Sequence, residues 1–170
     1  MDTTSLSVAN DCPETTSAAR IVLTYGTFDL FHVGHLRLLQ RLRQLGDRLI
    51  VGVSTDEFNE SKGKKSIVRY EDRLEIVASL SCVDHAFPEN AWDQKQHDIK
   101  RFNASVFGMG HDWEGKFDHL KKDCSVVYLA RTEHVSSTEI KRLLQILDRS
   151  HVRDLKRALD LISSIVERFE

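Results

Sequence analysis

Two histidines three residues apart, His32 and His35, lie in a segment whose composition suits phosphate binding. Residues 21–24 before them form an apolar, β-branched run typical of a buried strand, and residues 36–45 place apolar side chains at helical spacing. The histidines therefore lie in a strand-to-helix turn, where the free N–H groups of the helix favour anions. Gly34 lets a phosphate approach the backbone, and the imidazoles supply hydrogen-bond donors. Ordinary polar turn residues are the alternative, but the position between a strand and a helix favours an anion site.

A second candidate anion site lies towards the end of the chain. Residues 124–130 form an apolar run that predicts a strand, and Ser136 and Glu139 have the spacing of a capping box. A helix is therefore expected to begin at Ser136. Its free N–H groups and the hydroxyls of Ser136, Ser137 and Thr138 can bind a phosphate. The alternative, which applies to most capping boxes, is a helix start without a ligand.

The most concentrated basic segment covers residues 61–66. Its flexible ammonium groups can close over a triphosphate. A solvated loop is the alternative, and composition alone favours it. Arg73, in a helix predicted to start at residue 70, can bind phosphate or pair on the surface with Glu71 or Asp72.

A loop at residues 111–118 follows a predicted strand at residues 105–110. Its Asp112, Trp113 and Lys116 offer a hydrogen-bond acceptor, an aromatic face and a cation. Such a set suits a polyol phosphate or a nucleoside, and a solvent-exposed loop is the alternative.

These functional segments follow strands in an alternating strand and helix pattern. The expected strands cover residues 21–24, 49–54, 83–87, 105–110 and 124–130. Right-handed crossovers place such strands in parallel, so we expect an α/β fold. It is a Rossmann-like, doubly wound, five-stranded parallel sheet with helices on both faces, plus a C-terminal helix. Pro88 is expected to end the third strand, and helical spacing follows over residues 89–103.

The length of 170 residues fits one main domain, expected over residues 21–148. A polar, flexible leader is expected at residues 1–20, without the apolar segment of a secretory signal. A helical extension is expected at residues 149–170, with apolar positions three and four apart. This helix is expected to pack on its own sheet, and a dimer seam is the less favoured alternative.

Charge and cysteine content exclude several classes of protein. The net charge of −2 and the isoelectric point near 6.4 give no basic field for nucleic acid. No apolar run approaches the roughly 20 residues of a membrane span. Cys12, Cys82 and Cys124 lie far apart without metal-ligand spacing. The sequence therefore predicts a cytoplasmic protein without a disulfide framework.

Residues 27–35 resemble the H-x-G-H signature of the nucleotidyltransferase superfamily. Residues 109–118 are similar to a loop of the glycerol-3-phosphate cytidylyltransferases, and residues 131–138 are similar to the second signature of that family. The resemblance extends over about residues 21–147. His111 and His134 depart from the family pattern, which usually has an acidic residue and a glycine there.

The resemblance implies an enzyme that transfers the cytidylyl group of CTP to sn-glycerol 3-phosphate. Pyrophosphate leaves, and the CDP-glycerol formed serves wall or capsule polymers such as teichoic acids. The acceptor phosphate is the nucleophile, so attack is in line and needs no covalent enzyme intermediate. The resemblance also implies Mg²⁺ carried by the CTP phosphates, and a homodimer. The alternatives are a cytidylyl- or adenylyltransferase for another phosphorylated alcohol, and a non-catalytic nucleotide-binding module.

The resemblance also implies three sets of site residues and no residue for a resident metal. The catalytic residues are His32, His35, Lys62 and Arg131. The CTP-binding residues are Thr27, Phe28, His32, His35, Lys64, Arg73, Asp112, Arg131, Thr132, Ser136, Ser137 and Thr138. The acceptor-binding residues are Lys62, Lys64, Asp112 and Trp113.

Overall fold

The structure, a computed structural model, describes residues 19–131, 137–143, 154, 156 and 157. Five parallel strands form one sheet in the order β3-β2-β1-β4-β5. The strands are β1 (Ile21–Gly26), β2 (Arg48–Ser54), β3 (His85–Glu89), β4 (Val106–Gly110) and β5 (Ser125–Leu129). The predicted five-stranded parallel sheet is confirmed.

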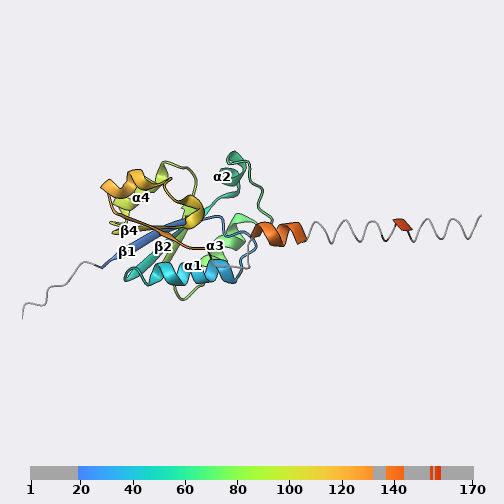
Figure 1. Cartoon of the computed structure of the whole chain (residues 1–170), viewed down its shortest axis with the longest axis horizontal. Coiled ribbons are helices and arrows are strands. Elements are labelled where there is room, and N and C mark those ends of the chain that lie inside the picture. Colours follow the sequence, from blue (N-terminus) through green and yellow to red (C-terminus); the bar gives the residue numbers. More distant parts are fainter. Residues whose placement is uncertain (1–18, 132–136, 144–153, 155, 158–170) are drawn as a thin grey trace, which may run out of the picture.

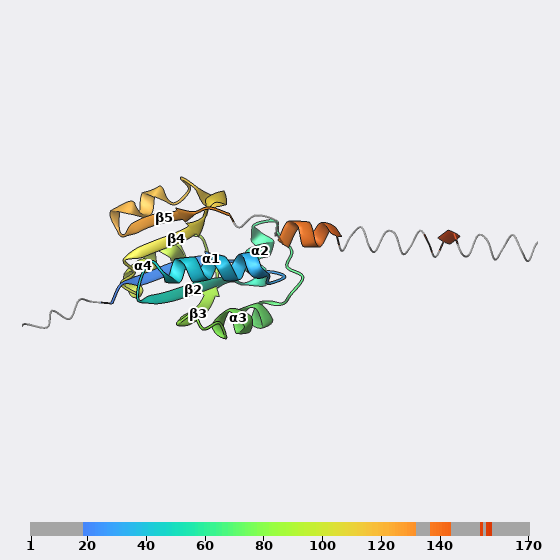
Figure 2. The same ribbon diagram turned by 60° about the horizontal axis from the view of Figure 1, so that its bottom comes forward.

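Helices cover both faces of this sheet. They are α1 (Val33–Arg43), α2 (Asp56–Ser61), α3 (Tyr70–Ala78) and α4 (Gln94–Arg101), with 3-10 helices η1 (His111–Trp113) and η2 (Asp118–Lys122). Figures 1 and 2 show α1 and α3 on one face of the sheet and α4 on the other. Residues 137–143 are also helical. The doubly wound arrangement is therefore confirmed, whereas the leader and the C-terminal extension lie almost entirely outside the described residues.

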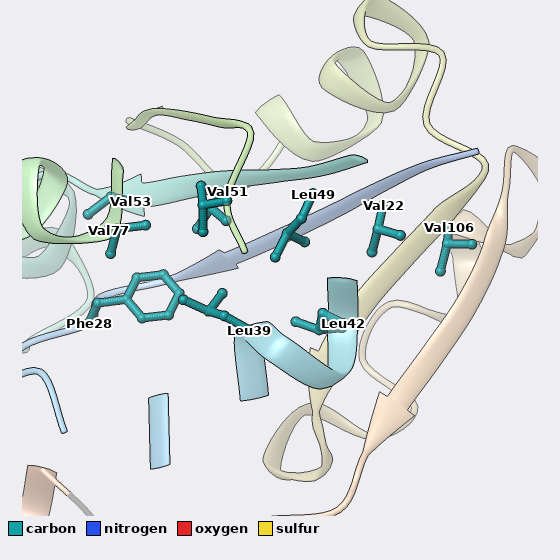
Figure 3. Close-up of a cluster of buried hydrophobic side chains, with 10 residues drawn as sticks. Val22, Phe28, Leu39, Leu42, Leu49, Val51, Val53, Val77 and Val106 are labelled. Carbon is teal, nitrogen blue, oxygen red and sulfur yellow. The ribbon is translucent and has the colours of Figure 1, made fainter. Parts of the chain in front are cut away.

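Alternate residues of each central strand enter two separate cores, because successive side chains of a strand point to opposite faces. Val22 of β1 packs with Leu39 and Leu42 of α1 in one core (Figure 3), whereas the next residue, Leu23, packs with Ile99 of α4 in the other. Both faces are thus buried, as expected for a parallel sheet. Among the described residues, no helix has the length and apolar character needed to cross a membrane.

The third strand differs from its prediction. Pro88 lies inside β3 and pairs with Val53 instead of ending the strand. The sheet accepts this proline because β3 is an edge strand, where one side needs no N–H donor. Glu89 consequently belongs to the strand, and α4 begins at Gln94 rather than at residue 89.

Candidate active site

A cavity of about 510 Å³ lies at the carboxyl ends of β1, β4 and β5. The connections from β1 and β4 leave towards opposite edges of the sheet, and open α/β sheets bind ligands at such a switch point. Most of the predicted CTP-binding residues line it: Thr27, Phe28, His32, His35, Lys64, Asp112, Arg131, Ser137 and Thr138. Trp113 lines it too. Thr132 and Ser136 lie outside the described residues.

The turn after β1 is held in an unusual backbone conformation. Phe28 has φ 54° and Leu30 has φ 48°, in the left-handed region that side chains other than glycine rarely adopt. His32 caps α1, because its Nδ1 accepts a 3.0 Å hydrogen bond from the backbone N–H of Gly34. The cap explains why α1 begins at Val33, three residues earlier than predicted. It also assigns the proton of a neutral His32 to Nε2.

The second predicted anion segment meets this turn through Ser137. The Ser137 hydroxyl donates to the backbone carbonyl of Asp29 at 2.9 Å, and its oxygen lies 3.3 Å from Nε2 of His32. The Nε2–H group of His32 can therefore donate to the serine oxygen. The structure thus brings the histidine turn and the start of helix 137–143 into one site.

The two histidines form a stacked pair with 4.0 Å between ring centroids. Burial, and then the proximity of His32, lower the pKa of His35 to about 4. Burial, and then the positive charge of Arg131, lower the pKa of His32. Nδ1 of His35 is buried without a partner among the described residues, which favours the tautomer with the proton on Nε2. At neutral pH the cavity therefore contains two uncharged imidazoles that act as hydrogen-bond donors.

Asp29, which the sequence interpretation missed, ties three segments together. Its carboxylate accepts hydrogen bonds from the backbone N–H groups of Ile67 at 3.0 Å and Val68 at 2.9 Å. It also pairs with Nζ of Lys141 at 2.7 Å. Burial alone would raise the pKa of Asp29, but Lys141 and the two N–H groups outweigh it, so the pKa is below its ordinary value. The histidine turn, the segment after the lysines and helix 137–143 are joined at this carboxylate.

We expect Asp29→Asn to lower the free energy of unfolding by about 1–3 kcal/mol at neutral pH, because the ion pair and one strong acceptor are lost. Since folding lowers the pKa from 3.8, the contribution is complete above about pH 4 and disappears as the pH falls through the folded pKa. Urea unfolding at several pH values measures the difference. Asp72→Asn, which removes an exposed pair with Arg69, is the control. Equal losses in the two variants would refute this role of Asp29.

Arg73 does not line the cavity, contrary to its predicted contact with CTP. Its guanidinium donates to three backbone carbonyls: Val68 at 3.0 Å, Thr27 at 2.5 Å and Ser54 at 2.8 Å. It also pairs with Asp56 at 2.6 Å. The side chain is fully buried, and protein acceptors surround it. Arg73 therefore holds the turn at Thr27 in place from the protein interior, outside the cavity.

The surface alternative for Arg73 is also wrong. Arg73 is 1 % exposed and pairs with Asp56 of α2, whereas Asp72 pairs with the exposed Arg69. Sequence spacing offered Glu71 and Asp72 as partners because they lie close along the chain. The actual partner lies seventeen residues away and meets Arg73 only in the folded protein.

A second cavity of about 870 Å³ adjoins the first and shares Lys64 and Trp113 with it. The structure places Lys62 here, away from the histidine cavity, with Nζ 4.0 Å from the ring centroid of Phe58. Lys95 of α4 lies here too, with Nζ 4.8 Å from the ring centroid of Trp92. Ammonium groups between aromatic rings suit a small anion with an apolar or polyol part.

Lys95 was missed because the sequence places it in an ordinary amphipathic helix. Its side chain is only 3 % exposed, although lysine is seldom fully buried without a partner. The partner is Glu89, at the end of the strand whose length was underestimated. Because the predicted third strand ended before Glu89, neither Glu89 nor its pairing with Lys95 was identified from the sequence.

Comparisons with known proteins agree with this geometry. Residues 23–143 match the model of the family described as cytidylyltransferase-like. A glycerol-3-phosphate cytidylyltransferase of Staphylococcus aureus is 54 % identical over 123 residues, which cover 72 % of this chain and 93 % of that protein. The enzyme of the same name from Bacillus subtilis is 57 % identical over 120 residues, covering 71 % and 93 %.

A solved structure supports the fold independently. The lipopolysaccharide core biosynthesis protein from Thermoplasma volcanium aligns with a TM-score of 0.62 at 24 % identity. The alignment covers 68 % of this chain and all of that one. The chain belongs to the cytidylyltransferase-like family, in the group of the glycerol-3-phosphate cytidylyltransferases.

Proposed function

We propose that this protein transfers the cytidylyl group of CTP to sn-glycerol 3-phosphate, forming CDP-glycerol and pyrophosphate. The observation that carries this proposal is the pair of adjoining cavities that share Lys64 and Trp113. One cavity holds neutral imidazoles and a helix start, which suit a triphosphate, and the other holds lysines and aromatic rings. The relatives from Staphylococcus aureus and Bacillus subtilis are named glycerol-3-phosphate cytidylyltransferases, which supports the same acceptor and the same transferred group.

In the proposed reaction, an oxygen of the acceptor phosphate attacks the α-phosphorus of CTP. The new P–O bond forms as the bond to pyrophosphate breaks, and pyrophosphate takes the electron pair. Catalysis then consists of bringing two anions together and stabilising the developing negative charge. No side chain has to act as a nucleophile.

The cavity residues have separate roles in this mechanism. His35 donates a hydrogen bond to a phosphate oxygen of CTP, and His32 shares its Nε2–H between the Ser137 oxygen and a phosphate oxygen. Arg131 and Lys64 neutralise the charge of the phosphates. Ser137 and Thr138 bind phosphate at the start of their helix. We assign Thr132 and Ser136 to the same group on the resemblance alone. Mg²⁺ would be carried by the CTP phosphates, as the resemblance implies, and would neutralise part of their charge.

The second cavity binds the acceptor in this proposal. Lys62 and Lys95 pair with the phosphate of glycerol 3-phosphate. Asp112, which lines the first cavity next to the shared Trp113, accepts hydrogen bonds from hydroxyl groups of the acceptor. Trp113 lines both cavities and therefore lies at their junction, where the acceptor phosphate meets the α-phosphate of CTP. A homodimer, which the resemblance implies, and a cytoplasmic location, which the sequence predicts, stay part of the proposal.

A pyrophosphate-release assay that crosses CTP and ATP with several phosphorylated alcohols tests this function. We expect the highest kcat/KM for CTP with glycerol 3-phosphate, because the cationic aromatic cavity favours a small phosphomonoester. A preference for ATP or for another alcohol phosphate would support the alternative transferases. Nucleotide binding without pyrophosphate release from any pair would support a non-catalytic binding module and refute the proposal.

A further inference from the structure

Glu89, the last residue of β3, contacts two lysines of the second cavity, Lys62 and Lys95, without lining the cavity itself. It is 3 % exposed, and its Oε1 pairs with Nζ of Lys95. Its Oε2 accepts a hydrogen bond from the hydroxyl of Ser54 and lies 3.9 Å from Nζ of Lys62. Lys62 in turn donates to the Ser54 oxygen at 3.1 Å. One buried carboxylate therefore holds Lys95 directly and Lys62 mainly through Ser54.

The charges of this cluster do not balance. Two ammonium groups face one carboxylate, and both lysines line the cavity whereas Glu89 does not. Buried charges are costly unless they are paired, so the excess positive charge favours an anion that enters from the cavity side. The orientation of the cluster thus presents the lysines to the ligand and keeps the carboxylate on the far side.

We propose that Glu89 is a positioning residue that holds Lys62 and Lys95 in place for the phosphate of the acceptor. This inference rests on the proposed function, in which that phosphate is the nucleophile. A lysine has a flexible stem and loses substantial side-chain entropy when it binds a ligand. A lysine fixed before the substrate arrives avoids much of that cost and directs the attacking oxygen.

Glu89 also affects the protonation of Lys62. Burial lowers the pKa of Lys62 to about 8, and the negative charge of Glu89 opposes this shift. Lys64 from the adjoining loop, Lys95 from α4 and Arg73 from α3 face Lys62 with positive charge and lower its pKa further. Loss of the Glu89 charge should therefore lower the pKa of Lys62 and leave part of it neutral near pH 7. A neutral amine binds phosphate poorly, so the KM for the acceptor increases as the pH rises through the pKa of Lys62. Without the Glu89 charge, this increase should begin at a lower pH than in the wild type.

The test compares Glu89→Gln with the full-length wild-type protein in steady-state kinetics from about pH 6 to about pH 9, a range that includes the expected titration. We expect the variant to raise the KM for glycerol 3-phosphate about 10–100-fold near pH 7.5, as for loss of a hydrogen bond to a charged group. The KM for CTP should change little. The pH at which the acceptor KM begins to rise should fall by about one unit. Loss of packing alone would not move that pH.

Two further variants separate charge from position. Glu89→Asp keeps the charge but withdraws it from the lysines, so we expect a higher acceptor KM with the pH of the rise unchanged. Glu75→Gln removes an exposed carboxylate of α3 and should match the wild type. A wild-type acceptor KM in Glu89→Asp would overturn the positioning role even if Glu89→Gln did not fold.

Failure of the positioning role of Glu89 can be distinguished from failure of the proposed function. If the wild type turns over CTP and glycerol 3-phosphate while folded Glu89→Gln keeps its acceptor KM and pH profile, the role of Glu89 is wrong and the function stands. If the wild type releases no pyrophosphate, the proposed function fails. Calorimetric binding of glycerol 3-phosphate to both proteins then decides the role of Glu89. Weaker binding to Glu89→Gln supports it, and equal binding overturns it.

Discussion

His35→Ala is expected to lower kcat about 10²–10³-fold, the loss that follows removal of one well-placed donor to a developing negative charge. His35 lines the nucleotide cavity, stacks on His32 and packs against the ring of Phe28. Because its pKa is near 4, the imidazole is already neutral and a donor before CTP binds. Pyrophosphate release at saturating CTP and glycerol 3-phosphate measures the loss.

The matched control for His35→Ala is His97→Ala. The His97 side chain is 78 % exposed on α4, and its removal should leave kcat unchanged. Circular dichroism establishes that both variants are folded. Near-wild-type turnover of folded His35→Ala would contradict the role assigned to this imidazole.

Arg73→Met is expected to lower the free energy of unfolding by about 3–5 kcal/mol, the usual cost of breaking a buried ion pair. The methionine fills similar space but leaves the carbonyls of Thr27 and Ser54 without their donor and Asp56 without its partner. Activity should fall as well, because Thr27 begins the turn that holds the histidines. Urea unfolding measures the stability change.

Arg69→Met is the control for this substitution. Arg69 lies four residues before Arg73 and makes an exposed pair with Asp72, so its removal should have little effect on the free energy of unfolding. Arg73→Lys keeps the charge but cannot make all four contacts, and we expect intermediate stability. If Arg69→Met and Arg73→Met lose equal stability, Arg73 does not support the turn.

The sheet and the main cavity could be predicted because their signals are local. Apolar runs such as residues 49–54 identify strands, and the strand-to-helix turn at His32 places the histidines at the carboxyl edge of the sheet. The start of the Ser137 helix belongs to the same edge, so the two segments meet although they lie 105 residues apart. The topology alone brings them together.

The buried contacts that hold the site in place could not be predicted, because each joins residues that lie far apart in the sequence. Asp29 contacts Lys141, and Arg73 contacts Asp56 and Thr27. The type of a charged residue does not reveal the direction of its side chain, and near neighbours offered plausible surface partners for Arg73. Glu89 was excluded from the third strand because Pro88 was expected to end it. The strand continues to Glu89 because an edge strand accepts a proline.

A crystal structure of the protein with bound CDP-glycerol tests the central claim most directly. We predict the phosphate next to cytidine within hydrogen-bond distance of His32 and His35, and the glycerol phosphate between Lys62 and Lys95. Trp113 should lie at the junction of the two cavities, as it does in the free protein. Cytidine phosphates bound away from the histidine pair, or a glycerol phosphate outside the second cavity, would contradict the proposed site.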